Sequence, residues 1–309
     1  MSEHIVHTVL LNDSLALLGR LENITPEIKH IMLEYSHFAF RGCVTVSGGM
    51  FSSGLLEQVK NHRLNLTDDN KAIFAFTLGW LSHRACDHTM KPIWKEQPFV
   101  GRGTDEDPAI SPTECSIYHE GEAYRRYLIN DEIYTDAIFK NKLSTLVHEG
   151  IRLEIAEKLI QGVMAANLMQ IQTINDGIPD QQRFEEICLR MQKFYIDMDR
   201  YCAAIEKPDN DKYLAHVKNI NWYDENDDII KTAHNVKVGT DSLDSLTART
   251  FADYGKSYYA VALARSVYYM LAGIYFVFDD SASTDWLDQQ LKVEQPVFDG
   301  WTLKEIAYE

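Results

Sequence analysis

Two residues with metal-binding chemistry lie one helical turn apart in the first third of the chain. His83 and Asp87 are four positions apart, in a stretch with no helix-breaking residue between Ala72 and Pro92. This spacing places an imidazole and a carboxylate on one face of a helix, and zinc accepts both groups as ligands. Because burying them without partners is costly, either a cation or a direct His–Asp hydrogen bond must satisfy the pair.

Three more histidines and another carboxylate occur on other predicted helices. His7 lies at the start of the first helix, and His62 lies at the end of a short one. His119 is followed three positions later by Glu122, so these two side chains share a helix face. Helical bundles build metal sites from inward side chains of several helices. The predicted metal ligands are His7, His62, His83, Asp87, His119 and Glu122.

The order and spacing of these residues resemble the zinc-dependent phospholipase C and S1/P1 nuclease superfamily. The resemblance is carried by Gly79-Trp80-Leu81-Ser82-His83 through Asp87, and by a glycine-rich turn at 42–49. His7 and His62 before the motif and His119 after it also match, so the resemblance covers residues 4 to 130. It implies an all-α fold, a trinuclear zinc site, hydrolysis of phosphate esters, and ligands with a choline head or a nucleobase.

The chain also departs from that pattern at three positions. Gly48 and Gly49 stand where the resemblance implies a metal-binding aspartate. Lys91 stands where it implies a histidine, and an ammonium group repels a cation. The acid after His119 is at i+3, as Glu122, instead of i+4. The sequence therefore predicts a reduced site of one to three zinc ions, with Asp87 as a catalytic residue and Lys91 as a catalytic charge that holds an anionic substrate.

Helical periodicity predicts one all-α multi-helix bundle domain of phospholipase C/P1 nuclease type over residues 1–309. Residues 1–130 carry the metal-site motifs, and residues 131–309 complete the bundle. We expect loops at 41–53 and at 95–112, the second as a lid or substrate loop, and a solvated acidic run at 224–228. The predicted helices are 7–21, 26–40, 55–62, 68–92, 114–130, 141–172, 179–206, 212–220 and 242–278.

Composition narrows the classes of partner and compartment. The formal charge of −16 argues against nucleic acid and anionic membranes as general partners. Five scattered cysteines without a CxxC pair favour reduced thiols in the cytoplasm. The N-terminus lacks the features of a signal peptide. The apolar run 258–278 contains Arg265 and many tyrosines, so we expect a buried core helix and no transmembrane segment.

Three functions remain open from the sequence. The leading hypothesis is a metal-dependent hydrolase that acts on a small-molecule or lipid-headgroup phosphate ester. The alternative is a non-catalytic binding or scaffold protein, in which His83 and Asp87 form a buried hydrogen bond. The third is a helical metalloenzyme with diverged chemistry, such as a non-haem iron oxygenase. The sequence makes no prediction of the oligomeric state.

Overall fold

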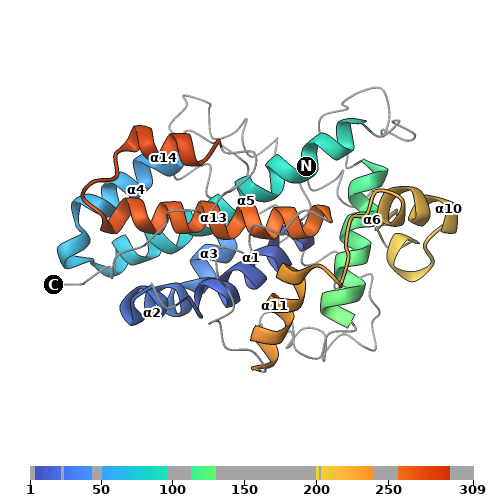
Figure 1. Ribbon diagram of the computed structural model, residues 1–309, viewed down its shortest axis with the longest axis horizontal. Coiled ribbons are helices and arrows are strands. Elements are labelled where there is room, and N and C mark those ends of the chain that lie inside the picture. Colours follow the sequence, from blue (N-terminus) through green and yellow to red (C-terminus); the bar gives the residue numbers. More distant parts are fainter. Residues whose placement is uncertain are drawn as a thin grey trace, which may run out of the picture. The chain divides into compact units, whose positions relative to one another are not determined.

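The computed structural model describes residues 4–21, 24–43, 51–96, 113–129, 200–201, 203–239 and 257–292 (Figure 1). These residues form helices and short connections and contain no strand, which confirms the all-α prediction for this part of the chain. The chain divides into two compact units, and the division falls within helices α1 (His4–Leu18) and α5 (Asp68–Glu96). One unit holds 1–9, 44–46 and 91–222, and the other holds 10–43, 47–90 and 223–309. The prediction of one domain over 1–309 includes segments outside the described residues and stays a prediction.

Helix α13 (Tyr258–Phe278) is the central helix of the second unit. It packs against α4 (Phe51–Asn61), α11 (Asp228–Val238) and α14 (Thr284–Gln290). Within the described ranges it is the one helix long and apolar enough to cross a membrane, yet 83% of its apolar window is buried inside the protein. That burial is what a core helix requires.

Helices α3 (Ser36–Cys43) and α5 touch backbone to backbone. A Cβ atom added to Gly79 would lie 1.9 Å from the carbonyl oxygen of Ala39, and one added to Gly42 would lie 2.0 Å from that of Phe76. Only a hydrogen atom fits at either position, so both glycines are required by the close approach. The contact brings the end of α3, at Cys43, against the middle of α5.

Buried hydroxyl groups link α1, α5 and α13. The Ser14 and Ser266 hydroxyl oxygens lie 2.7 Å apart, and Ser266 donates a hydrogen bond to Ser82 over 2.8 Å. About two turns earlier in α13, the Tyr259 hydroxyl donates to the Asp13 carboxylate over 2.9 Å. Because unpaired buried polar groups are costly, these bonds fix how the three helices are rotated against one another.

In the first unit, α6 (Glu114–Ala123) is capped at its N-terminus by Thr113, whose hydroxyl accepts a hydrogen bond from the Ser116 N–H over 3.1 Å. The π-helix η2 (Tyr124–Ile129) continues from it, and α6 packs against η3 (Leu214–Lys218), which follows α10 (Asn210–Tyr213). All α6 side chains from Cys115 to Ala123 are buried. The polar groups among them must therefore find partners inside the protein.

Several predicted boundaries are wrong. The predicted helix 26–40 is interrupted at Tyr35, so it forms α2 (Pro26–Glu34) and α3. The predicted loop 41–53 is helical at 41–43 and 51–53, because Gly42 serves helix packing and not a turn. Helix α5 continues past Pro92 to Glu96, although this proline lacks the N–H group that would bond the carbonyl group four residues earlier.

Two helices were missed, and one predicted surface run is partly buried. Helices α11 and α14 were not predicted. Within 224–228, Asp227 is 1% exposed and accepts a hydrogen bond from the Ser257 hydroxyl, which itself caps α13. A charge run in the sequence does not show which carboxylate bonds the capping serine of another helix. Most of the predicted loop 95–112 and of the helices 141–172 and 179–206 lies outside the described residues.

The α3–α5 contact leads to a stability prediction. Gly79→Ala should lower the free energy of unfolding by at least about 1–3 kcal/mol, because the added methyl group overlaps the α3 backbone. Gly54→Ala is the matched control, since nothing lies within 4 Å of a Cβ there, and it should stabilise α4 by about 0.5–1 kcal/mol. Urea unfolding followed by circular dichroism measures both. Equal effects of the two substitutions would contradict the close approach.

Candidate metal centre

The ring of His83 is oriented by a backbone carbonyl group. Its Nδ1 atom lies 2.8 Å from the carbonyl oxygen of Cys43, and both residues are buried. A carbonyl oxygen only accepts hydrogen bonds, so Nδ1 carries a hydrogen, and in the metal-binding form of the ring the lone pair is on Nε2. Metal-binding histidines are typically held in this way by a second partner.

That Nε2 atom faces Asp87. The distance from His83 Nε2 to Asp87 Oδ2 is 3.1 Å, and the two side chains are 1% and 4% exposed. A lone pair and a carboxylate oxygen repel one another unless a proton or a cation lies with them. Two ligands of one tetrahedral zinc ion, each about 2.0–2.1 Å from the metal, lie about 3.3 Å apart. The observed distance therefore fits either an ion pair or shared coordination of a cation.

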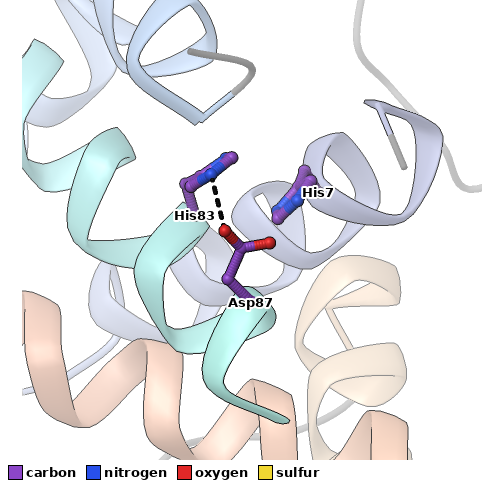
Figure 2. Close-up of side chains that lie close together, drawn as sticks. All are labelled: His7, His83 and Asp87. Atoms are coloured by element: carbon purple, nitrogen blue, oxygen red, sulfur yellow. Dashed lines mark ion pairs between the residues drawn. The ribbon is translucent and has the colours of Figure 1, made fainter. Parts of the chain in front are cut away.

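His7 of α1 completes the group (Figure 2). One ligand atom from each of His7, His83 and Asp87 lies within 4.8 Å of the others, and all three residues are buried. Within the described ranges, this is the group of three or more such side chains that could hold a metal ion. The group combines two imidazoles with one carboxylate. Burying a carboxylate in an apolar interior is costly, and a divalent cation among these side chains would offset that cost.

His62 lies away from this group. It is an exposed residue just after α4, and its Nδ1 donates a hydrogen bond to the Gln58 carbonyl oxygen over 2.9 Å. The ring therefore satisfies a carbonyl group at the C-terminal end of the helix. The metal-capable group does not include it.

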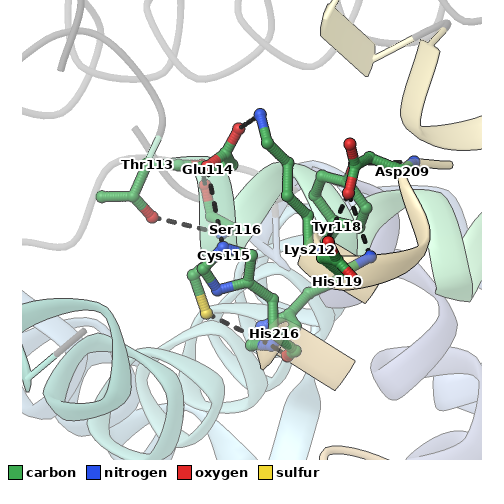
Figure 3. A network of polar contacts seen from close by, with 10 residues as sticks. Thr113, Glu114, Cys115, Ser116, Tyr118, His119, Asp209, Lys212 and His216 are labelled. Atoms are coloured by element: carbon green, nitrogen blue, oxygen red, sulfur yellow. Dashed lines mark hydrogen bonds and ion pairs between the residues drawn. The ribbon is translucent and has the colours of Figure 1, made fainter. Parts of the chain in front are cut away.

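His119 is buried in α6 with other partners (Figure 3). Its Nε2 lies 2.9 Å from the His216 carbonyl oxygen, and its ring stacks on Trp222 with centroids 4.9 Å apart. Burial lowers the pKa of His119 to about 3, so the ring is neutral near pH 7. The Cys115 thiol lies 3.5 Å from the same Nε2. Because this nitrogen carries the hydrogen donated to the carbonyl group, it cannot act as a base toward the thiol.

The Glu122 carboxylate is neutralised by arginines. It accepts hydrogen bonds from Arg125 over 2.8 Å and from Arg126 over 2.7 Å. Burial raises its pKa, but these bonds outweigh burial and leave the pKa below its ordinary value.

Lys91, half-buried on α5, lies one turn beyond Asp87. The structure thus brings together three of the six predicted ligands, and His62, His119 and Glu122 are not among them.

Two contributors to the site were missed from the sequence. One is the Cys43 carbonyl group, which has no side-chain signal. The other is Glu120, fully buried, whose carboxylate accepts hydrogen bonds from the N–H groups of Ile5 over 2.8 Å and Val6 over 3.0 Å. The first turn of α1 contains no acidic residue of its own. This lack of a local acidic cap was the available signal, but it does not identify a partner more than a hundred residues away.

Glu120 gives a pH prediction. Burial raises its pKa from 4.5 to about 8, although the two N–H groups oppose the shift. Between these values the unfolded chain releases a proton that the folded protein keeps, so the free energy of unfolding should fall as the pH rises through this window. Glu120→Gln does not titrate and should reduce that slope. Urea unfolding at pH 5, 6.5 and 8 checks it, and parallel profiles for the two proteins would contradict it.

Comparison with known proteins assigns no family to the chain. No family model matches it, and no curated protein or solved structure gives a match. The resemblance to the phospholipase C and P1 nuclease superfamily therefore rests on the motif residues alone. The chemical case for the site rests on its own geometry.

Proposed function

We propose that the protein is a metal-dependent hydrolase of phosphate esters with one metal ion held by His7, His83 and Asp87. The observation that carries the proposal is the buried group itself, in which two imidazoles and a carboxylate from α1 and α5 converge. The resemblance of residues 79–87 to zinc-dependent phosphoesterases supplies the reaction class. The phospholipase C/P1 nuclease type of the fold is part of the same proposal.

The donor set fits one zinc ion. Catalytic zinc sites use three protein ligands from histidine and carboxylate side chains and keep a further position open. The Cys43 carbonyl holds His83 with its Nε2 toward Asp87, as expected of a ligand with a second-layer partner. A trinuclear site does not fit, because Gly48 and Gly49 provide no carboxylate where the resemblance implies one.

The roles of the chain's own residues follow from their charges. When bound, zinc would polarise a phosphoryl oxygen and make water more acidic. Asp87 contributes the negative charge that holds the cation, and His83 is fixed in one tautomer. Lys91 lies four residues beyond Asp87 on α5, on the same side of the helix. We propose that its ammonium group binds the anionic oxygens of the substrate. That substrate is a small-molecule or lipid-headgroup phosphate ester.

Two other functions are separated by the metal. Two histidines and one carboxylate are also the ligand set of non-haem iron oxygenases. If the protein were such an oxygenase, iron would be the metal that it binds tightly. A scaffold protein would need no metal, because a proton shared between His83 Nε2 and Asp87 Oδ2, which lie 3.1 Å apart, can satisfy both side chains. The metal content of the purified protein, which can be zinc, iron or neither, distinguishes the three functions.

Substitution of the ligands tests the site. His83→Ala removes one donor of a three-ligand set and Asp87→Asn removes its negative charge, so each should weaken zinc binding until the purified protein retains little metal and hydrolyses little bis(p-nitrophenyl) phosphate. His30→Ala is the control, since His30 is exposed on α2 and pairs with Glu34. Elemental mass spectrometry and the rate of nitrophenolate release are the measurements. Unchanged metal content in the His83 and Asp87 variants would sink the proposal.

Metal binding should also stabilise the fold. Zinc at a free concentration 100 times its dissociation constant should add about 2.7 kcal/mol to the free energy of unfolding, because it binds only the folded site. A chelator should reverse the gain, and Asp87→Asn should abolish it. Chemical unfolding with and without zinc measures the difference. Equal stabilisation of the wild type and the Asp87 variant would show that zinc binds elsewhere.

A further inference from the structure

The N-terminus of α1 is capped by a residue distant in sequence. Glu120 of α6 accepts hydrogen bonds from Ile5 and Val6, one on each carboxylate oxygen. These are the second and third residues of the helix, whose N–H groups have no partner within it. A local serine, threonine or aspartate normally takes this role. Here the cap comes from 114 and 115 residues away.

The capped turn is the one that carries His7. His7 directly follows Val6, so its backbone lies within the first turn and a half of α1. Without a cap, the first turn of a helix frays, because its N–H groups are better satisfied by water. Fraying there would displace the imidazole that lies with His83 and Asp87.

Glu120 is well suited to hold this turn. Its side chain is 0% exposed, so water does not compete for its two hydrogen bonds. Its carboxyl oxygens also place negative charge density at the positive end of the helix dipole. Two bonds to consecutive N–H groups define both the position and the direction of the helix start.

We propose that Glu120 is a positioning residue of the metal site, which holds His7 in place by capping α1. This inference rests on the proposed metal-binding function. Glu120 does not touch the metal. It acts through the backbone of Ile5 and Val6, and its loss should weaken metal binding without removing any ligand.

Cobalt(II), a spectroscopic substitute for zinc, gives the test. Glu120→Gln keeps the side-chain shape but replaces one accepting oxygen with an NH₂ group that cannot accept from an N–H. It should weaken cobalt(II) binding by about 10- to 100-fold, as loss of an outer-layer partner does, and it should change the visible spectrum of the bound ion. Glu114→Gln is the matched control, because Glu114 lies on the same helix and pairs with Lys212 and not with α1. It should bind like the wild type.

A double substitution separates positioning from general stability. In a His7→Ala background, Glu120→Gln should cause no further loss of cobalt(II) affinity, because its effect passes through His7. Should Glu120→Gln not fold, Glu120→Asp supplies the same comparison with the carboxyl group kept and the reach shortened. Wild-type affinity and spectrum in a folded Glu120 variant would overturn the positioning role alone. Absence of cobalt(II) binding by the wild type would overturn the proposed function as well.

Discussion

The hydrogen bond from His83 Nδ1 to the Cys43 carbonyl is the interaction on which the candidate site depends. It fixes the tautomer of the imidazole and directs Nε2 toward Asp87. The bond requires the end of α3 to lie against α5, and Gly42 and Gly79 permit this because neither position has room for a Cβ atom. Gly79 in the central motif therefore has a packing role that supports the chemistry of His83 four residues later.

The third member of the group depends on the start of α1. Glu120 satisfies the first free N–H groups of this helix, and the Ser14, Ser266 and Ser82 hydroxyls fix its later turns against α13 and α5. Each of these polar anchors is buried. Metal ligands held by such anchors are in position before the ion arrives, which lowers the conformational cost of binding.

Local features were predictable from the sequence, and tertiary partners were not. The His83–Asp87 pair follows from helical spacing, and the starts of α2 and α6 follow from the capping residues Thr25 and Thr113. In contrast, Glu122 and its arginines are close in sequence, but only packing decides whether the carboxylate meets arginines or a metal. Likewise, nothing local to Glu120 indicates that it caps a helix more than a hundred residues away.

X-ray absorption at the zinc edge of the metal-loaded protein is the most direct measurement of the central claim. The geometry predicts a first coordination layer of two imidazole nitrogens and carboxylate or water oxygens at about 2.0–2.1 Å, and His7→Ala should reduce it to one imidazole. A spectrum dominated by sulfur at about 2.3 Å, or a protein that retains no zinc after desalting, would contradict a metal site formed by His7, His83 and Asp87.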